Sequence, residues 1–470
     1  MTAAKGIGGT TPAVLIAGAG LVLIVAVPFA FIILQAVFLN LGSGSFNAPF
    51  AHLFATLANS ALIGMTFNTV VLGLSVVACS ALLAVPLGIF RALFRVPLAP
   101  LWDVLLLVPF MIPPYIATLG WIMTLQPRGY LQQLAGFNLA PFLFSLGGMT
   151  LIMALNTFPV VYFAVSRTVE AVGARYSDVA RVFGSSPARA FWRITLPLAT
   201  PGLAASLLLV FAMAIEEYGT PAALGRRAHF EVLVSGIDLR ISDWPIDLPG
   251  AAVISLILVA LSFLAFLIQR RILAGRSFET TGGKPQNKDK RPLGRLALPV
   301  VALFAIVAFL ATGVPLLAVL ATAMQKTISG GLVPGNLGFE NFSAIFFTDV
   351  AGGLRALGIS LALGVATALI AGLLGALSSY VVVKTRLRGR RTIDVLTVIP
   401  NALPGIVVAV GLILAWNQPA LPFSPYNTPL ILLLAYCCIL LPQPVRYATA
   451  ALLQVGDSLE AAARVCGASG

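Results

Sequence analysis

Two adjacent carboxylates lie near the end of a strongly apolar segment. Glu216 and Glu217 are followed by Tyr218 and Gly219, at the end of the stretch 199–221. Ionisable groups inside membrane spans are costly and are functional candidates by default. The tetrapeptide could face a water-filled path, line a gate, or simply mark the interfacial end of a helix. We therefore treat these four residues as a candidate translocation path.

The residues that an enzyme would need are not gathered in this sequence. Both histidines, His52 and His229, fall between apolar segments, and no His-Glu-x-x-His pattern occurs. The four cysteines show no metal-ligand spacing, so we expect neither a metal nor a cofactor. No G-x-x-x-x-G-K-[ST] phosphate loop occurs in the 470 residues. We expect a protein that is not an enzyme and whose energy comes from a partner.

A second set of candidate residues lies in the loop 170–202, which reads EAVGARYSDVARVFGSSPARAFWRITLPLATPG. Gly184 can take the left-handed conformation that stops a helix. Ser186 can cap the next helix, and Pro187 suits its first turn. Pro197 then marks a re-entry toward the membrane. The pattern predicts a short amphipathic helix beneath a bundle, which is a docking surface.

Membrane-spanning helices must position both sets of residues. The chain is 59% hydrophobic and only 10% charged, whereas a soluble domain carries roughly 25% charged residues. A spanning helix needs about 20 mostly apolar residues. The fold class that we predict is an all-α, polytopic transmembrane helical bundle. The candidate spans are 12–38, 61–90, 101–125, 143–166, 199–221, 250–270, 296–323, 356–383, 393–416 and 429–452.

The basic residues predict how these spans are oriented. A net charge of +13 would suggest a nucleic-acid partner in a soluble chain. Here most arginines and lysines lie in alternate inter-helix loops, as the positive-inside rule expects. Those loops and the N-terminus are predicted to be cytoplasmic. We expect membrane lipid around the chain and no nucleic acid.

The sequence contains an internal repeat. One set of positions recurs at an offset of 291: Asp103, Pro109, Pro113 and Gly120 match Asp394, Pro400, Pro404 and Gly411. A later set recurs at an offset of 283: Pro159, Gly173 and Gly184 match Pro442, Gly456 and Gly467. Two parallel repeats build a pseudo-twofold bundle about the membrane normal. The paired aspartates fall near equivalent helix starts, where a carboxylate complements the helix dipole.

The repeat predicts two membrane domains. Residues 1–270 form a first domain of six spans, and 271–295 form a basic cytoplasmic linker. Residues 296–470 form a second domain of four spans, which ends within the loop that corresponds to 170–197. We expect from this that the second repeat lacks its last two spans.

The loop 170–197 resembles the EAA motif of type I ABC importer permeases: Glu-Ala-Ala, three residues, Gly, nine residues, Ile, one residue, Leu-Pro. The matching residues are Asp178, Ala180, Arg181, Gly184, Ile194, Leu196 and Pro197 in the first loop, and Ala463, Arg464 and Gly467 in the second. Asp178 replaces the usual Glu, and in the second copy Ala461 holds the acidic position. One loop alone could be a structural helical hairpin, but two loops in register argue against that.

The resemblance implies the permease subunit of an ABC importer in a bacterial inner membrane, with both membrane domains fused. Its loops would dock on a separate ATPase, expected to be a homodimer, and a periplasmic binding protein would deliver a small solute. The fused layout and the Glu-Tyr-Gly segment resemble permeases for ferric iron, with relatives for 2-aminoethylphosphonate, thiamine and putrescine. The alternative is an ion-coupled secondary transporter or channel, which has no need of paired ATPase-docking loops.

Overall fold

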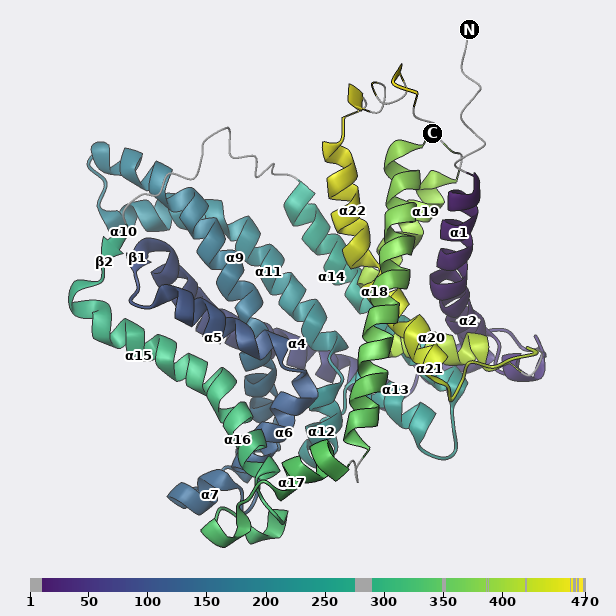
Figure 1. Cartoon of the computed structure of the whole chain (residues 1–470), viewed down its shortest axis with the longest axis horizontal. Helices are drawn as coiled ribbons and strands as arrows, with labels where there is room; N and C mark the ends of the chain where they lie inside the picture. The colour runs from purple at the N-terminus through teal and green to yellow at the C-terminus, as the bar shows by residue number, and fades with distance from the viewer. Residues whose placement is uncertain are drawn as a thin grey trace. The chain divides into compact units, whose positions relative to one another are not determined.

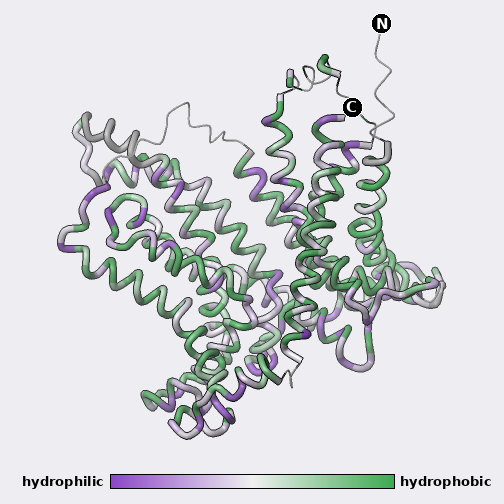
Figure 2. The backbone as a smooth tube through the Cα atoms, viewed as in Figure 1, coloured by the Kyte–Doolittle hydropathy of each residue, from purple (hydrophilic) through white to green (hydrophobic). Residues whose placement is uncertain are grey.

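The computed structural model describes residues 11–274, 290–348, 352–385, 387, 389–418, 421–456, 458, 459, 462 and 465–467. Within these ranges seven helices are long and apolar enough to cross a membrane, and three bent helix pairs raise the number to as many as ten. Apolar residues run along the helices, while polar residues gather at helix ends and in loops (Figure 2). The predicted all-α polytopic fold is thereby confirmed.

The chain forms two compact units, and each unit takes segments from both predicted halves. Unit 1 comprises Met1–Asn59, Ile237–Ala260 and Asp349–Gly470, and unit 2 comprises Ser60–Gly236 and Leu261–Thr348. The first span of each half therefore packs in the unit built around the other half. These units are groups in space, whereas the predicted domains, 1–270 and 296–470, are divisions of the sequence. The predicted domain boundaries therefore stay a prediction.

Unit 2 is built around the first repeat. Helices α4, α9 and α11 pack side by side, and α15–α16 packs along α5 and α6 (Figure 1). A Cβ on Gly120 of α6 would lie 2.6 Å from the backbone of Pro315 in α16, so only glycine permits this approach. The principal elements of this unit are α4 (Ser60–Leu93), β1 (Phe94–Arg95), α5 (Ala99–Met111), α6 (Pro114–Leu125), α7 (Tyr130–Ala135), α8 (Ala140–Leu143), α9 (Leu146–Val182), α10 (Pro187–Ala190), α11 (Leu196–Glu216), α12 (Gly219–Ala228), β2 (Arg291–Pro292), α15 (Ala297–Ala308), α16 (Val314–Ala323) and α17 (Glu340–Ser343). Strands β1 and β2 pair in parallel.

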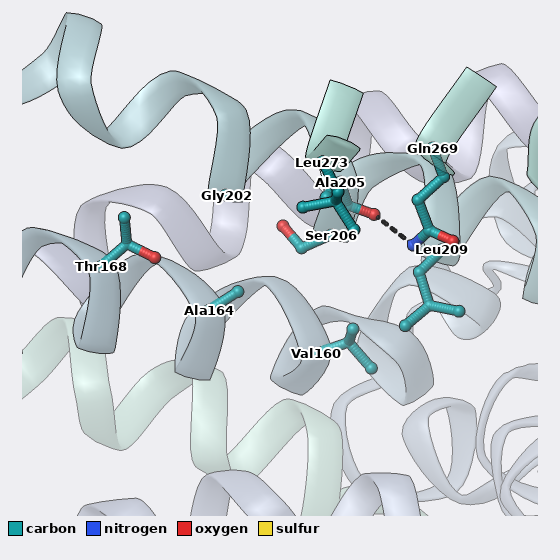
Figure 3. A pocket seen from close by; sticks show the side chains of 9 residues that line it. All are labelled: Val160, Ala164, Thr168, Gly202, Ala205, Ser206, Leu209, Gln269 and Leu273. Carbon is teal, nitrogen blue, oxygen red and sulfur yellow. Dashed lines mark hydrogen bonds between the residues drawn. The ribbon is translucent and has the colours of Figure 1, made fainter. Parts of the chain in front are cut away.

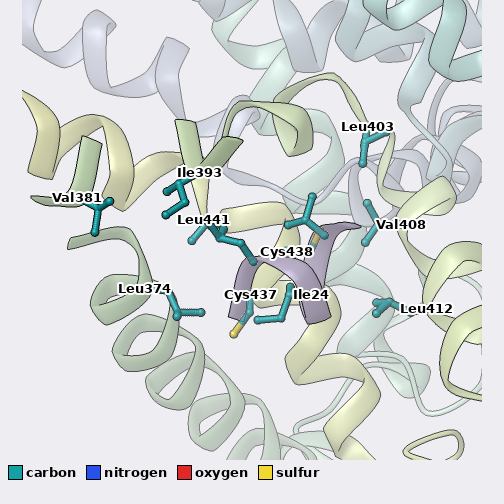
Figure 4. Close-up of a cluster of buried hydrophobic side chains, with 12 residues drawn as sticks. Ile24, Leu374, Val381, Ile393, Leu403, Val408, Leu412, Cys437, Cys438 and Leu441 are labelled. Carbon is teal, nitrogen blue, oxygen red and sulfur yellow. The ribbon is translucent and has the colours of Figure 1, made fainter. Parts of the chain in front are cut away.

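Unit 1 repeats this plan around the second repeat. Helix α1 packs along α18, and α2 packs along α20. Here a Cβ on Gly411 would lie 2.8 Å from the carbonyl oxygen of Pro28. A buried apolar cluster that includes Leu374, Cys437 and Leu441 holds the helices together (Figure 4). The helices are α1 (Thr11–Leu21), α2 (Val27–Val37), α3 (Ala51–Leu57), α18 (Gly353–Lys384), α19 (Arg390–Val398), α20 (Gly405–Trp416), α21 (Pro429–Leu440) and α22 (Pro442–Gln454), while α13 (Leu233–Ser242) and α14 (Leu248–Ala274) cross the boundary between units.

The helices of the two repeats share boundaries at the offsets found in the sequence. At the offset of 291, α4 and α18 end together, α5 and α19 begin together, and α6 and α20 have the same bounds. At the offset of 283, α9 and α21 begin together. One difference stands out: α9 passes straight through Pro159, whereas α21 and α22 bend by 44° at the matching Pro442.

Candidate functional site

The EAA-like loop (170–197) turns at Gly184. Helix α9 ends at Val182, and Gly184 has a φ of +79°, the left-handed conformation that the sequence predicted. The backbone N–H of Arg189 donates to Ser186 Oγ at 3.3 Å, and α10 begins at Pro187, so the predicted helix start is also present. Nothing lies within 4 Å of where a Cβ on Gly184 would stand. Backbone conformation, and not space, is what favours glycine here.

Helix α11, which is part of a candidate span, begins at Leu196, where Pro197 predicted the re-entry, but the chain does not break there. Helix α10 passes into a π turn, Phe191–Thr195, and then into α11. Proline lacks an N–H group and its ring clashes with the carbonyl four residues earlier in a regular α-helix, and a widened π turn just before it relieves both problems. The loop helix is therefore continuous with a helix long enough to span a membrane.

The described part of the loop exposes aromatic and basic side chains. Phe183 is 85% exposed and Trp192 is 65% exposed. The Trp192 ring packs edge-on against Phe191, with 5.7 Å between the ring centroids. Arg189 and Arg193 are exposed beside them. Aromatic side chains and arginine are enriched at protein interfaces, so this surface suits a protein partner.

The other predicted loop residues are described only in part. Outside the described part lie the side chains of Asp178, Ala180 and Arg181 and the whole of Ala463 and Arg464. Ile194 and Leu196 are half-buried and Pro197 is exposed. Gly467, the counterpart of Gly184, has a φ of +91°. Both loops thus contain a glycine in a conformation that other residues adopt only with strain.

A sharp bend interrupts the third span of each repeat. Helices α5 and α6 meet at 97°, and the segment Arg390–Ala402 meets α20 at 119°. Pro113 and Pro404 precede α6 and α20 with similar dihedral angles, φ −53° and ψ 131° against φ −56° and ψ 142°. Proline provides no N–H donor and disfavours a helical residue before it. The matched prolines of the repeat therefore produce matched breaks.

Polar side chains surround the break in the first repeat. Asn156 of α9 donates through Nδ2 to the carbonyl oxygens of Pro109, at 2.7 Å, and Ile112, at 3.2 Å. Near the same break, the hydroxyls of Thr118 and Thr220 are buried and lie 2.9 Å apart. Backbone groups released by a broken helix must be satisfied internally within a membrane, and Asn156 does this here.

Sequence reasoning missed these polar residues. Each is a single polar residue within an apolar stretch, and one such residue gives no sign of a functional site. The site becomes visible only when the fold brings these stretches together. The usable signal was the comparison of the two repeats. At the sequence offsets, Asn156 corresponds to Ile439, and Thr118 corresponds to Ala409. The positions in the second repeat that match these two residues are thus apolar.

The predicted translocation-path residues lie at a helix junction. Glu216 ends α11, and α12 begins at Gly219. Both carboxylate oxygens of Glu217 accept the backbone N–H of Thr220, at 3.0 and 3.1 Å, so Glu217 caps α12. Glu216 is half-buried, and Tyr218 is exposed. Of the two carboxylates, Glu216 is thus the one that does not cap the helix.

Gly219 brings this junction against the first break. A Cβ on Gly219 would lie 2.9 Å from the backbone nitrogen and from the Cβ of Tyr115, which follows Pro113 by two residues. The structure therefore brings together the predicted segment 216–219 and the polar break within unit 2. This grouping is the best candidate for a transport path in the described residues.

The expected helix-dipole role of Asp103 and Asp394 is wrong. Neither α5 nor α19 has an acidic residue in its first turn, because each aspartate is the fifth residue of its helix. Asp103 is instead paired with Arg91, whose Nη2 lies 2.7 Å from Oδ2. Asp394 is exposed.

A shallow groove of about 360 Å³ lies between α9, α11 and the end of α14 (Figure 3). Its lining is mostly apolar, with Thr168, Ser206 and Gln269 as the polar contributors. Gln269 Nε2 donates to the carbonyl oxygen of Ala205 at 2.9 Å, so its amide is already engaged. The segment 216–219 does not line this groove. Elsewhere in the described ranges, no group of three His, Cys, Asp or Glu side chains is placed to hold a metal ion.

Comparison with known proteins connects these features to transporters. The profile of one protein family, described as "Binding-protein-dependent transport system inner membrane component", matches residues 84–277. The ferric transport system permease protein FbpB of Actinobacillus pleuropneumoniae is 26% identical over 368 residues, which cover 76% of this chain and 52% of that protein. The chain thus spans about half the length of this relative.

Shorter relatives match a smaller part of the chain. The molybdenum transport system permease protein ModB of Haemophilus influenzae is 30% identical over 216 residues, which cover 38% of this chain and 93% of that protein. ModB of Escherichia coli K12 is 28% identical over 208 residues, which cover 43% of this chain and 91% of that protein.

Proposed function

The chain belongs to the family of binding-protein-dependent transport system inner membrane components, and we propose that it forms the membrane pathway of an ATP-binding cassette importer. A separate ATPase, present as a homodimer, docks on the EAA-like loop and on its counterpart around Gly467. A periplasmic binding protein delivers the solute to the opposite side. The N-terminus and both loops face the cytoplasm of a bacterial cell. The chain itself carries out no ATP hydrolysis.

The observation that carries this proposal is the loop turn that occurs in both repeats. Gly184 and Gly467 have positive φ at matching positions. Beside the first of them lies an exposed surface that includes Phe183 and Trp192. The first loop is continuous with α11, so a force applied there reaches a helix long enough to span a membrane. These features suit a partner that moves the bundle by holding its loops.

The test is to co-express the chain with the candidate ATPase and to measure co-purification and ATP-driven uptake. Trp192→Ala is expected to reduce the ATPase retained by the chain, because it removes an exposed aromatic contact. Trp244→Ala is the matched control, since Trp244 is 89% exposed but lies far along the chain from either loop. Uptake that persists without ATP and collapses with an ionophore would support the ion-coupled alternative instead.

For the substrate, we propose ferric iron or a related small solute. Support comes from the ferric permease relative, which matches 76% of this chain, and from the half-buried carboxylate of Glu216, three residues before the Gly219 that lies against Tyr115. A carboxylate in a path favours a cation and disfavours an oxyanion such as molybdate. The test is uptake of radioactive iron and of molybdate by the complete system. 2-Aminoethylphosphonate, thiamine and putrescine serve as competitors, and preferred uptake of molybdate would contradict the proposal.

A further inference from the structure

Three side chains from three helices form a hydrogen-bonded cluster in the first repeat. Arg91, near the end of α4, contacts Asp103 of α5 through Nε, 3.1 Å from both carboxylate oxygens, and through Nη2, 2.7 Å from Oδ2. The hydroxyl of Tyr162 in α9 donates to Asp103 Oδ1 at 2.6 Å. Tyr162 is fully buried, and the ion pair is about three-quarters buried. We call these three residues the Asp103 joint.

Helix α9 holds α5 at a second point and leads directly into the EAA-like loop. Six residues before Tyr162, Asn156 donates to two carbonyl oxygens at the end of α5. Beyond Tyr162, Glu170 pairs with Lys290 at 3.2 Å, and Lys290 Nζ also donates to the carbonyl oxygen of Arg91 at 2.9 Å. One unbroken helix thus connects the loop to both ends of α5, which is the half of the broken span that precedes Pro113.

The second repeat keeps the aspartate and loses its partners. At the sequence offsets, Arg91 corresponds to Val382 and Tyr162 to Val445, and both valines pack against the apolar cluster of Figure 4. Asp394, the counterpart of Asp103, is exposed. The helix equivalent to α9 is bent by 44° between α21 and α22. The described polar contacts here are of another kind: Ser379 Oγ donates to the carbonyl oxygen of Val445 at 3.1 Å, and Arg446 Nη2 donates to Asn401 Oδ1 at 3.4 Å between partly exposed side chains. No ion pair occupies the positions that match Arg91 and Tyr162, which are valines.

We propose that the Asp103 joint transmits movement of the EAA-like loop to the broken span of the first repeat, and that the second repeat, whose described residues have no buried ion pair at the matching positions, is coupled less rigidly. A planar guanidinium paired with both oxygens of a carboxylate fixes orientation as well as distance. Apolar contacts are non-directional and tolerate sliding. Arg91, Asp103 and Tyr162 are positioning residues, which do not touch the solute. The inference rests on the proposed docking of an ATPase on the loop.

The test compares Asp103→Asn with the matched variant Asp394→Asn in the complete transport system in lipid vesicles. Solute taken up and ATP hydrolysed are measured in the same sample, together with the ATPase that co-purifies. We expect Asp103→Asn to lower the solute moved per ATP by about fivefold or more, as loss of a typical coupling between sites does. ATPase retention should stay normal. Asp394→Asn should leave the ratio close to that of the wild type.

Two further variants separate a positioning role from a structural one. Tyr162→Phe removes one hydroxyl and leaves the ion pair, so it should fold and lower the same ratio to a smaller extent. The exchange of Arg91→Asp with Asp103→Arg should recover part of the loss. The proposal is overturned if the two asparagine variants behave alike, or if Tyr162→Phe and Asp103→Asn reduce only the amount of folded protein. A wild-type chain that retains no ATPase would instead refute the proposed function.

Discussion

The two repeats have the same geometry and different chemistry at their broken spans. In the first, Asn156, Thr118 and the ion pair of Arg91 with Asp103 surround α5 and its break. In the second, the counterparts of Asn156 and Arg91 are Ile439 and Val382. Helix boundaries and bends nevertheless coincide. Prolines and glycines determine the shape through the backbone, and this leaves the side chains of each copy free to diverge in function.

The loop glycines give the largest expected effect. Gly184→Leu places a side chain where φ is +79°, at a cost of about 1–2 kcal/mol, and should tilt the loop helix without disrupting the spans. We expect uptake to fall by about tenfold or more while the chain remains in the membrane. Gly184→Asn is the control, because asparagine tolerates this conformation.

Comparison of Gly467→Leu with Gly184→Leu tests whether the two loops contribute equally to uptake. Its φ of +91° makes the strain similar, but its repeat lacks the Asp103 joint. We expect a smaller loss of uptake than for Gly184→Leu, measured in the same vesicles. Equal losses would mean that both repeats are driven alike.

The helix-crossing glycines should respond equally in the two repeats. Gly120→Ala and Gly411→Ala each force a Cβ against the backbone of Pro315 or Pro28, which should destabilise the folded chain by about 2–3 kcal/mol. Thermal unfolding in detergent measures this. Gly358→Ala is a control, since a Cβ there meets nothing within 4 Å. A large difference between the two crossing glycines would contradict the shared geometry.

A smaller effect is expected from the amide at the first break. Asn156→Leu leaves the carbonyl oxygens of Pro109 and Ile112 without their donor, at a cost of about 1–2 kcal/mol. Ile439→Leu, the matching change in the second repeat, keeps an apolar side chain of the same volume and should alter stability less. The unfolding midpoints of the two variants show whether the polar break is special to the first repeat.

The smallest effect is expected from an exposed ion pair. Lys326 Nζ lies 3.0 Å from Glu340 Oε1, and both side chains are about half exposed. Lys326→Ala should leave the unfolding midpoint and uptake unchanged, because water screens such pairs. A loss comparable with that of Asp103→Asn would show that pairing of charge alone, without burial, accounts for the behaviour of the joint.

The sequence predicted most of the fold because its signals are local. Apolar length predicted the spans, and Gly184 predicted a helix end that depends on few neighbours. The sharp bends at Pro113 and Pro404, inside the predicted spans 101–125 and 393–416, were not predicted. Pro197 lies in the first turn of α11, but the π turn just before it was not predicted from the sequence. The predicted dipole role of Asp103 was wrong, because α5 begins four residues before Asp103 and so leaves it beyond the first turn, and its partner Arg91 lies on another helix. Asn156 was missed because only the fold places it beside the break; its mismatch with Ile439 was the signal available in the sequence.

The exchange of first helices has a consequence for the order in which the protein is made. Residues 11–37 leave the ribosome before the rest of the described chain, yet α2 packs against α20, whose Gly411 is synthesised almost four hundred residues later. Contacts between distant segments form slowly, and unpartnered surfaces persist until they do. Helix α2 therefore stays in the lipid without its partner α20 until the whole first repeat has been inserted. Two halves made as separate polypeptides would have to be produced together for either unit to close.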